Sequence, residues 1–166
     1  MASCLSSRRM KTSPIRAGIF TKKNIRYFHK ARDLTQYSDI GRVQIGAIAV
    51  YKNEIIGMGY NTYKTHPLQC EYDKFRNLTL TDKVANLHSM HAEVMCIASI
   101  KRKDIDWSKV KLYIFREKKN KALGMCRPCR TCLQLIKDYG IRHVYYTTDE
   151  SFVYEFLADA ERKIKN

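Results

Sequence analysis

The chain has 166 residues, of which 31 are lysine or arginine and 16 are aspartate or glutamate, so its formal net charge is +15. This length is typical of one globular domain, and a hydrophobic content of 45% excludes a disordered chain despite the charge. No stretch approaches the roughly 20 apolar residues of a membrane-spanning helix, and the basic, serine-rich start lacks the apolar core of a secretory signal. We therefore expect an intracellular, cytoplasmic protein without a membrane partner.

Positive charge is concentrated in two segments of the chain. Residues 1–32 carry nine lysines and arginines and no acid, and residues 101–130 carry eleven against three acids. Such segments favour a polyanionic partner, such as tRNA or single-stranded nucleic acid, or an anionic substrate. The alternative is a solvated basic surface that only aids solubility.

The first half of the chain predicts an arm, a helix and a hairpin. Residues 1–17 contain a proline and no apolar periodicity, so we interpret them as a basic flexible arm before a single domain over residues 18–166. Apolar residues at roughly helical spacing predict a helix over Ile19–Tyr37. Two apolar runs, Val43–Tyr51 and Glu54–Tyr60, are joined by a polar dipeptide and predict a β-hairpin.

The second half of the chain alternates helices and strands. A long connection over residues 61–88 is expected to contain a short helix near Leu68–Asn77. In the next helix, Val94, Ile97 and Ala98 are expected to share one buried stripe. The further elements are a helix over Met90–Lys101, a strand over Val110–Arg116, a helix over Pro128–Tyr139 with proline in its first turn, and a strand over Arg142–Thr147. This order predicts an α/β fold with a mixed sheet flanked by helices.

The segment Ser151–Leu157 fits two structures. Alternation of Phe152, Tyr154 and Phe156 favours a strand, whereas apolar pairs four residues apart favour a helix. We prefer the helix, because residues 158–165 continue with good helix formers.

Two short motifs carry the residue types of a metal site, His91-Ala92-Glu93 and the run PCRTC that contains Cys129 and Cys132. Zn²⁺ takes imidazole and thiolate ligands in a tetrahedron. The two cysteines lie one turn apart at a helix start, where both sulfurs can point at one ion and the helix dipole favours thiolate. With His91 as the third ligand, a fourth position remains for water, whose pKa zinc lowers to about 7. Glu93 is near enough to take a proton from that water.

Together, the two motifs resemble those of the zinc-dependent cytidine deaminase-like superfamily, which includes cytidine, deoxycytidylate, tRNA adenosine and polynucleotide cytosine deaminases. The resemblance covers Val43 to about Thr147, and it implies a three-layer α-β-α sandwich in which a β-hairpin precedes β-α units. It also implies that His91, Cys129 and Cys132 bind zinc while Glu93 moves protons during hydrolytic deamination. Because members commonly form dimers or tetramers, the likeness implies a homo-oligomer.

Candidate substrate-binding residues come from the same comparison of motifs. Asn61 matches an asparagine that contacts the sugar of the substrate in many members, although an ordinary turn residue would fit the sequence equally well. We add Ala92 within the first motif, Tyr63 on the long connection, where a ring could stack on a base, and Arg127 just before the second motif.

Some features depart from the family pattern. A loop from Glu117 to Cys126 separates the third strand from the cysteine motif, and a fifth strand is not evident before Asn166. Cys126 extends the cysteine run, but an iron–sulfur cluster would need a fourth cysteine at suitable spacing. We therefore expect Cys126 to be a free thiol.

The sequence supports three functions. The first is a zinc-dependent hydrolytic deaminase acting on cytosine in a nucleotide such as CMP or dCMP. The second is a deaminase with the same chemistry that acts on adenosine in tRNA or on single-stranded nucleic acid, which the basic segments favour. The third is a non-catalytic zinc module that binds nucleic acid, and the presence of Glu93 argues against it.

Overall fold

The computed structural model describes residues 20–76 and 89–164. In chain order its elements are α1 (Lys22–Thr35), β1 (Gln44–Tyr51), β2 (Glu54–Tyr60), α2 (Pro67–Tyr72), the 3-10 turn η1 (Asp73–Phe75), α4 (Ala92–Ala98), the 3-10 turn η2 (Trp107–Lys109), β3 (Lys111–Glu117), α5 (Arg130–Asp138), β4 (His143–Thr147) and β5 (Phe152–Phe156). The basic arm predicted over residues 1–17 lies outside the described residues.

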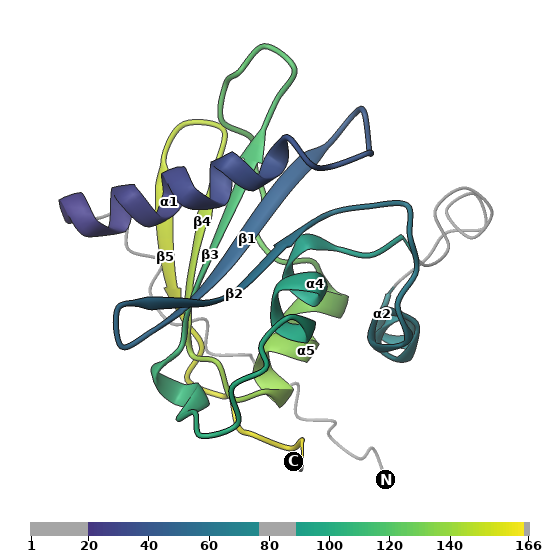
Figure 1. Ribbon diagram of the computed structural model, residues 1–166, viewed down its shortest axis with the longest axis vertical. Helices are drawn as coiled ribbons and strands as arrows, with labels where there is room; N and C mark the ends of the chain where they lie inside the picture. The colour runs from purple at the N-terminus through teal and green to yellow at the C-terminus, as the bar shows by residue number, and fades with distance from the viewer. Residues whose placement is uncertain (1–19, 77–88, 165–166) are drawn as a thin grey trace, which may run out of the picture.

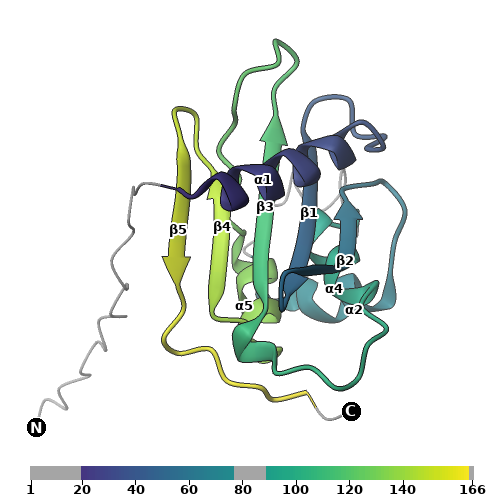
Figure 2. The same cartoon turned by 60° about the vertical axis from the view of Figure 1, so that its left-hand side comes forward.

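The strands form one mixed sheet in the order β2-β1-β3-β4-β5. Strands β3 and β4 are parallel, and the other neighbouring pairs are antiparallel. Helix α1 crosses one face of the sheet, while α2, α4 and α5 lie on the other (Figures 1 and 2). The predicted three-layer α-β-α sandwich with a mixed sheet is therefore confirmed.

Alternation along the strands separates two cores. In β1 and β3, successive side chains point to opposite faces of the sheet. Those on one face pack with Phe28 and Ala31 of α1, and the alternate ones pack on the face that carries α4 and α5. The first set is Ile48, Val50, Tyr113 and Phe115, and the second is Ala47, Ala49, Leu112 and Ile114. A group that faces α4 and α5 is thus separated from α1 by the sheet.

Helix α1 begins with a reciprocal capping box. The hydroxyl of Thr21 accepts the backbone N–H of Asn24 at 3.2 Å, and Oδ1 of Asn24 accepts the backbone N–H of Thr21 at 3.1 Å. The helix predicted over Ile19–Tyr37 is confirmed with slightly narrower ends.

The predicted hairpin is also confirmed. Lys52 and Asn53 both have positive φ angles, 47° and 71°, as a two-residue type I′ turn requires. Strand β2 then lies directly under α4, because a Cβ on Gly59 would come within 2.3 Å of the carbonyl oxygen of Ala92 and 2.4 Å of the backbone nitrogen of Cys96. The small residue lets the two backbones touch, which places the start of α4 over the end of β2.

The long connection contains the expected short helix. Helix α2 and the turn η1 together span Pro67–Phe75, so the helical segment begins one residue before the expected range Leu68–Asn77 and ends before its last residues. Residues 77–88 of this connection lie outside the described residues.

The preferred helix over Ser151–Leu157 is wrong, because this segment forms β5. It pairs with β4 in antiparallel register, which sets Tyr145 opposite Tyr154 and Thr147 opposite Phe152. Phe152 stacks on Phe28 of α1 with ring centroids 4.2 Å apart. The period-two alternation therefore reflected two packed faces, and burial on both outweighed helix propensity. β5 is also the fifth strand of the sheet, so the expectation that no fifth strand precedes Asn166 is wrong.

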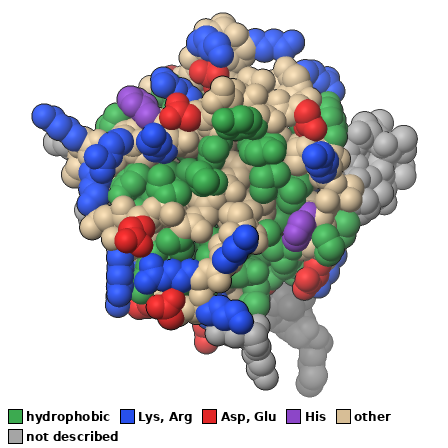
Figure 3. All heavy atoms as spheres, in the orientation of Figure 1, with side chains coloured by type: hydrophobic (Ala, Val, Ile, Leu, Met, Phe, Trp, Pro, Cys, Tyr) green, Lys and Arg blue, Asp and Glu red, His purple; other side chains and the backbone are tan. Residues whose placement is uncertain are grey.

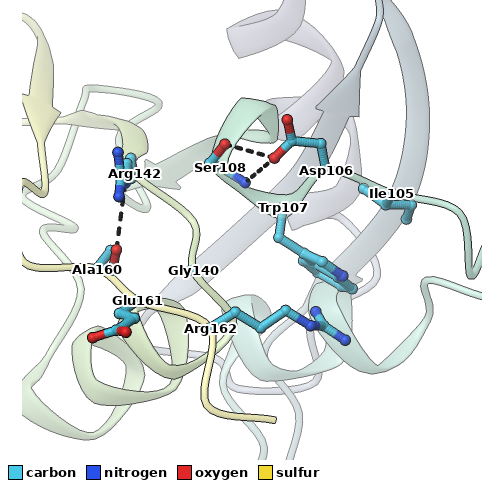
Figure 4. Close-up of a pocket in the computed structure, with 9 residues that line it drawn as sticks. All are labelled: Ile105, Asp106, Trp107, Ser108, Gly140, Arg142, Ala160, Glu161 and Arg162. Atoms are coloured by element: carbon cyan, nitrogen blue, oxygen red, sulfur yellow. Dashed lines mark hydrogen bonds between the residues drawn. The ribbon is translucent and has the colours of Figure 1, made fainter. Parts of the chain in front are cut away.

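Residues 158–164 form neither helix nor strand, contrary to the expected helical continuation. Ala160, Glu161 and Arg162 of this segment lie beside η2 around one small pocket (Figure 4). Nε of Arg142 donates to the carbonyl of Ala160 at 3.3 Å, and the guanidinium of Arg162 lies over the ring of Trp107 at 5.0 Å. Tertiary contacts therefore hold this extended segment.

Two details of the predicted helices differ from the structure. Ala98 is exposed rather than part of the buried stripe, because α4 ends there after only seven residues. Pro128 precedes the N-cap residue Cys129 and so lies outside α5. No helix within the described residues has the length and apolar character needed to cross a membrane.

Candidate metal centre

Both sequence motifs begin a helix. His91 is the N-cap of α4 and Cys129 is the N-cap of α5, each with extended backbone angles. Neither side chain caps its own helix, although N-cap side chains commonly accept a hydrogen bond from the helix start. The two side chains are therefore available to face each other.

The three predicted ligands come together in space. Nδ1 of His91 lies 3.2 Å from Sγ of Cys132 and 3.5 Å from Sγ of Cys129. The three ligand atoms all lie within 4.8 Å of one another. One imidazole nitrogen and two sulfurs are a donor set that suits zinc, and three protein ligands are the number found in catalytic zinc sites. The residues present thus fit the metal that the sequence implied.

Electrostatics within the cluster favour a thiolate. The hydrogen bond from the thiol of Cys132, followed by the interaction with His91, lowers the pKa of Cys129 to about 3. The hydrogen bond that Cys132 makes to Cys129, together with burial, raises the pKa of Cys132 well above its ordinary value. One sulfur is therefore ready to bind a cation, and the second would lose its proton on binding one.

Glu93 lies in the first turn of α4 and is only 5% exposed. Burial raises the pKa of its carboxyl group, while the charge of His91 opposes that shift. A buried carboxyl group with a raised pKa beside a ligand cluster suits a role in proton transfer.

The orientation of His91 depends on a residue that sequence reasoning missed. Gln69 in α2 is fully buried, and its Oε1 accepts the backbone N–H of His91 at 3.0 Å. Its Nε2 donates to Oδ1 of Asp73 at 2.8 Å. Arg76 contacts the other ring nitrogen of His91, Nε2. No spacing rule pointed to Gln69 or Arg76, because their link to His91 is a contact across the fold.

The candidate substrate-binding residues lie in different environments. Asn61 is buried and bridges backbone groups, since its Oδ1 accepts the N–H of Ile45 at 2.8 Å and its Nδ2 donates to the carbonyl of Val43 at 2.6 Å. Ala92 is fully buried under β2, whereas Tyr63 is 58% exposed on the connection after β2. The sugar contact suggested for Asn61 stays a prediction.

Arg127 anchors the loop before α5. Its guanidinium makes two hydrogen bonds to the carboxylate of Glu155 in β5, at 2.9 and 2.7 Å. The same carboxylate accepts the hydroxyl of Tyr146 at 3.2 Å. This bidentate pair ties the residue just before the cysteine motif to the edge strand.

Cys126 is a free thiol, as expected. It is buried, and its sulfur lies 3.1 Å from the hydroxyl of Thr147 and 3.4 Å from the carbonyl of Ile114. Burial raises the pKa of this thiol to about 12, which keeps it protonated. Cys126 therefore stabilises the loop that follows β3, separately from the ligand cluster.

Comparison with known families finds one match that covers most of the chain. The family described as the cytidine and deoxycytidylate deaminase zinc-binding region matches residues 21–148. A comparison with curated protein sequences finds no significant match.

Solved structures share this fold at low sequence identity. The dCMP deaminase of cyanophage S-TIM5 is similar in its apo form, with a TM-score of 0.53 and 22% identity over 77% of this chain and 84% of that one. Its complex with dCMP and dUMP gives a TM-score of 0.54 and 21% identity over 78% and 83%. The cytidine deaminase of Burkholderia pseudomallei has a TM-score of 0.55 and 15% sequence identity, over 82% of this chain and 98% of that one.

Proposed function

Because the chain belongs to the cytidine and deoxycytidylate deaminase family, we propose that it is a zinc-dependent hydrolytic deaminase of cytosine in a nucleotide such as dCMP or CMP. The observation that carries this proposal is the cluster of His91, Cys129 and Cys132 with the buried carboxyl group of Glu93 at its side. A zinc ion held by those three residues would supply a Lewis acid that makes water nucleophilic at neutral pH.

The chain's own residues would then handle the protons. Hydrolytic deamination adds the oxygen of water to C4 of cytosine, breaks the bond from C4 to the exocyclic nitrogen and releases ammonia. Glu93 would take a proton from the attacking water and pass it to the ring nitrogen, and then supply a proton to the departing amine. The upward shift of its pKa supports this role, because burial favours the protonated carboxyl group that must later return its proton.

Positive charge near the cluster supports a phosphorylated substrate over a free nucleoside. Arg76 contacts His91, and guanidinium groups bind phosphate oxygens in a bidentate manner. The dCMP deaminase of S-TIM5, which was solved with dCMP and dUMP, supports the choice of dCMP as the first substrate to test. We also infer a homo-oligomer in the cytoplasm, as the sequence predicts.

A second candidate function is deamination of adenosine in tRNA or of cytosine in single-stranded nucleic acid. The observation that favours it is the basic sequence of residues 1–32 and 101–130, which exceeds what one phosphate group needs. A non-catalytic zinc module would have no use for a buried carboxyl group such as Glu93 beside its ligands, and we rank it third.

The decisive experiment measures ammonia release by the zinc-loaded protein on dCMP, CMP, cytidine, tRNA and single-stranded DNA. Glu93→Gln should keep its zinc and lose at least about 100-fold in turnover, since a positioned general acid–base contributes roughly 10²–10⁴-fold. Glu150→Gln, which alters an exposed carboxyl group in the turn before β5, is the matched control and should keep full activity.

Each outcome of this experiment has a definite meaning. Turnover confined to dCMP or CMP would support the proposal, and turnover confined to polymers would replace it with the second function. Full activity of Glu93→Gln would overturn the assigned mechanism. Zinc binding without turnover on any substrate would favour the non-catalytic module.

A further inference from the structure

We propose that Tyr72 is a positioning residue for the candidate metal centre. Its hydroxyl group ties α2 to the end of α5, and α2 in turn holds His91 through Gln69. The start of α4 is thereby held in place relative to the helix that carries Cys129 and Cys132. The inference deepens the proposed function and rests on its zinc site, but its test does not depend on turnover.

The candidate ligands belong to two separate helices. His91 is the N-cap of α4, and the two cysteines lie at the start of α5. The chain runs through 38 positions between His91 and Cys129. A metal ion binds tightly where its ligands already stand at the right separation, so a contact that ties the two helices together bears on affinity.

Helix α2 contacts both of these helices. All three lie on the same face of the sheet, and α2 packs against α4 and against α5 (Figures 1 and 2). Gln69 and Tyr72 are three residues apart in α2, so their side chains lie on the same side of the helix. Both are buried, with 0% and 5% of their surface exposed. One buried side of α2 therefore carries both side chains.

Tyr72 makes the contact to α5. Its hydroxyl donates to Oδ2 of Asp138 at 3.1 Å, across 66 positions of the chain. Burial, followed by this hydrogen bond, raises the pKa of Tyr72, so the hydroxyl keeps its proton and remains a donor. The ring packs beside Phe75 of η1 with centroids 5.8 Å apart. The hydroxyl thus adds a directed polar bond to an otherwise apolar contact.

Asp138 carries its carboxylate at an unfavourable place. Charged side chains project from the surface of the face drawn in Figure 3, whereas the side chain of Asp138 is only 14% exposed. Asp138 is also the last residue of α5, where the negative end of the helix dipole disfavours a negative charge. The cost of this carboxylate is therefore offset by its partners.

These partners divide between the two carboxylate oxygens. Oδ1 accepts Nε2 of Gln134 at 2.9 Å and lies 3.6 Å from Nζ of Lys163. Oδ2 accepts the hydroxyl of Tyr72. The bond from Gln134 stays within α5, whereas the bond from Tyr72 joins two helices. Removing each bond in turn separates an effect on Asp138 from an effect of the link between helices.

Gln69 passes the position of α2 on to the metal motif. Its Oε1 accepts the backbone N–H of His91 at 3.0 Å, and its Nε2 donates to Oδ1 of Asp73 at 2.8 Å. A planar amide that is bonded at both ends cannot rotate without losing one of these bonds. A shift of α2 would therefore move the start of α4 or break the bond to His91. Tyr72 acts on the metal centre through this step.

The test compares Tyr72→Phe with two control variants. Tyr27→Phe also removes one hydroxyl from a ring that is 5% exposed, and its lost bond, to the carbonyl of Asn53, lies on the α1 side of the sheet. Gln134→Leu removes a hydrogen bond to Asp138 that lies within α5. The first control matches the chemical change, and the second matches the acceptor.

Zinc affinity is measured by competition with a zinc-binding dye. We expect Tyr72→Phe to lose about tenfold, the lower end of the effect of removing an outer contact of a metal site, and both controls to change by less than about twofold. Thermal unfolding of the metal-free proteins shows that each variant is folded. A purely structural role would lower the unfolding midpoint of Tyr72→Phe and Tyr27→Phe alike and leave zinc affinity unchanged.

Cobalt(II) and a double variant give two further readouts. Co²⁺ binds to the same types of ligand, and its visible absorption depends on coordination geometry, so Tyr72→Phe should change the spectrum and Tyr27→Phe should keep it. Because Tyr72 acts through Gln69, the double variant Gln69→Leu with Tyr72→Phe should bind zinc as tightly as Gln69→Leu alone. Losses that multiply in the double variant would overturn the route through Gln69.

The remaining outcomes also decide the proposal. Unchanged zinc affinity and cobalt spectrum in Tyr72→Phe, beside a wild-type chain that binds zinc, would overturn this inference and leave the proposed function standing. An equal loss of affinity in Gln134→Leu would assign the effect to Asp138 rather than to the link between helices, and would overturn it too. A wild-type chain that binds no zinc would overturn both the inference and the proposed function.

Discussion

The side chain of Gln69 accepts the backbone N–H of His91 across 22 positions of the sequence. His91 is the N-cap of α4, so its N–H lies outside the hydrogen bonding of that helix and needs another partner. Gln69 provides this partner from α2 while it also donates to Asp73. A fully buried amide thus joins a short helix of the connection to the first residue of the metal motif.

Replacing Gln69 should weaken both the fold and the metal site. Gln69→Leu leaves the N–H of His91 without the acceptor that Gln69 provides and removes one hydrogen bond to the carboxylate of Asp73. An unsatisfied buried polar group costs about 1–3 kcal/mol. Loss of such an orienting contact lowers metal affinity by about 10–100-fold. Urea unfolding and competition with a zinc-binding dye would measure the two effects.

Gln134→Leu is the matched control for this change. Nε2 of Gln134 donates to Oδ1 of Asp138 at 2.9 Å, the same four-residue spacing as Gln69 and Asp73. The control should lose some stability and keep its zinc affinity. Equal zinc affinity in the two variants would contradict the orienting role of Gln69.

Cys132→Ala should remove one ligand and the metal with it. Cys132 is fully buried, so the variant should also lose the stabilisation that a bound ion adds to the folded state. The zinc content measured by atomic absorption should fall from about one per chain to near zero. Cys96→Ala changes another fully buried thiol in α4, and it should keep its zinc. Retention of zinc by Cys132→Ala would remove Cys132 from the ligand set.

Gly59→Ala should destabilise the protein severely. Its Cβ would lie 2.3 Å from the carbonyl oxygen of Ala92 and 2.4 Å from the nitrogen of Cys96, and both atoms belong to the backbone of α4. Because a backbone cannot rotate away as a side chain can, we expect a loss of about 3 kcal/mol or more in the free energy of unfolding. At Gly41 a Cβ would meet nothing within 4 Å, so Gly41→Ala should change the free energy of unfolding by less than about 0.5 kcal/mol. Similar stability of the two variants would contradict the close packing of α4 on β2.

The pair of Glu155 and Arg127 should make stability depend on acid pH. The hydrogen bonds from Arg127 lower the pKa of the Glu155 carboxyl group below its ordinary value of 4.5. A folded-state pKa below the unfolded one stabilises the protein above the unfolded value, and this contribution is lost as pH falls through the folded value. The free energy of unfolding should therefore decrease with acidification below about pH 5.

Denaturant titrations at several pH values would measure this dependence. Glu155→Gln should flatten the acid limb, whereas Glu150→Gln, at an exposed position, should keep it. An unchanged acid limb in Glu155→Gln would assign the pH dependence to other carboxyl groups.

Local patterns in the sequence were sufficient for much of the fold and for bringing the candidate metal ligands to attention. The hairpin followed from two apolar runs joined by a polar dipeptide, Lys52-Asn53. The candidate ligand set followed from the types and spacing of His91, Cys129 and Cys132, whose ligand atoms the structure brings within 4.8 Å of one another. These features could be predicted because each depends on neighbours in the chain or on ligand chemistry that few residue types provide.

Packing settled the remaining features. The segment Phe152–Phe156 satisfied two local patterns equally well, and pairing with β4 made it a strand. Nothing in the local sequence pointed to the contacts that Gln69 and Arg127 make, because their partners His91 and Glu155 lie 22 and 28 positions away. The partner of such an amide or guanidinium is the group that the fold brings near, and it is set by how helices and strands pack rather than by spacing along the chain.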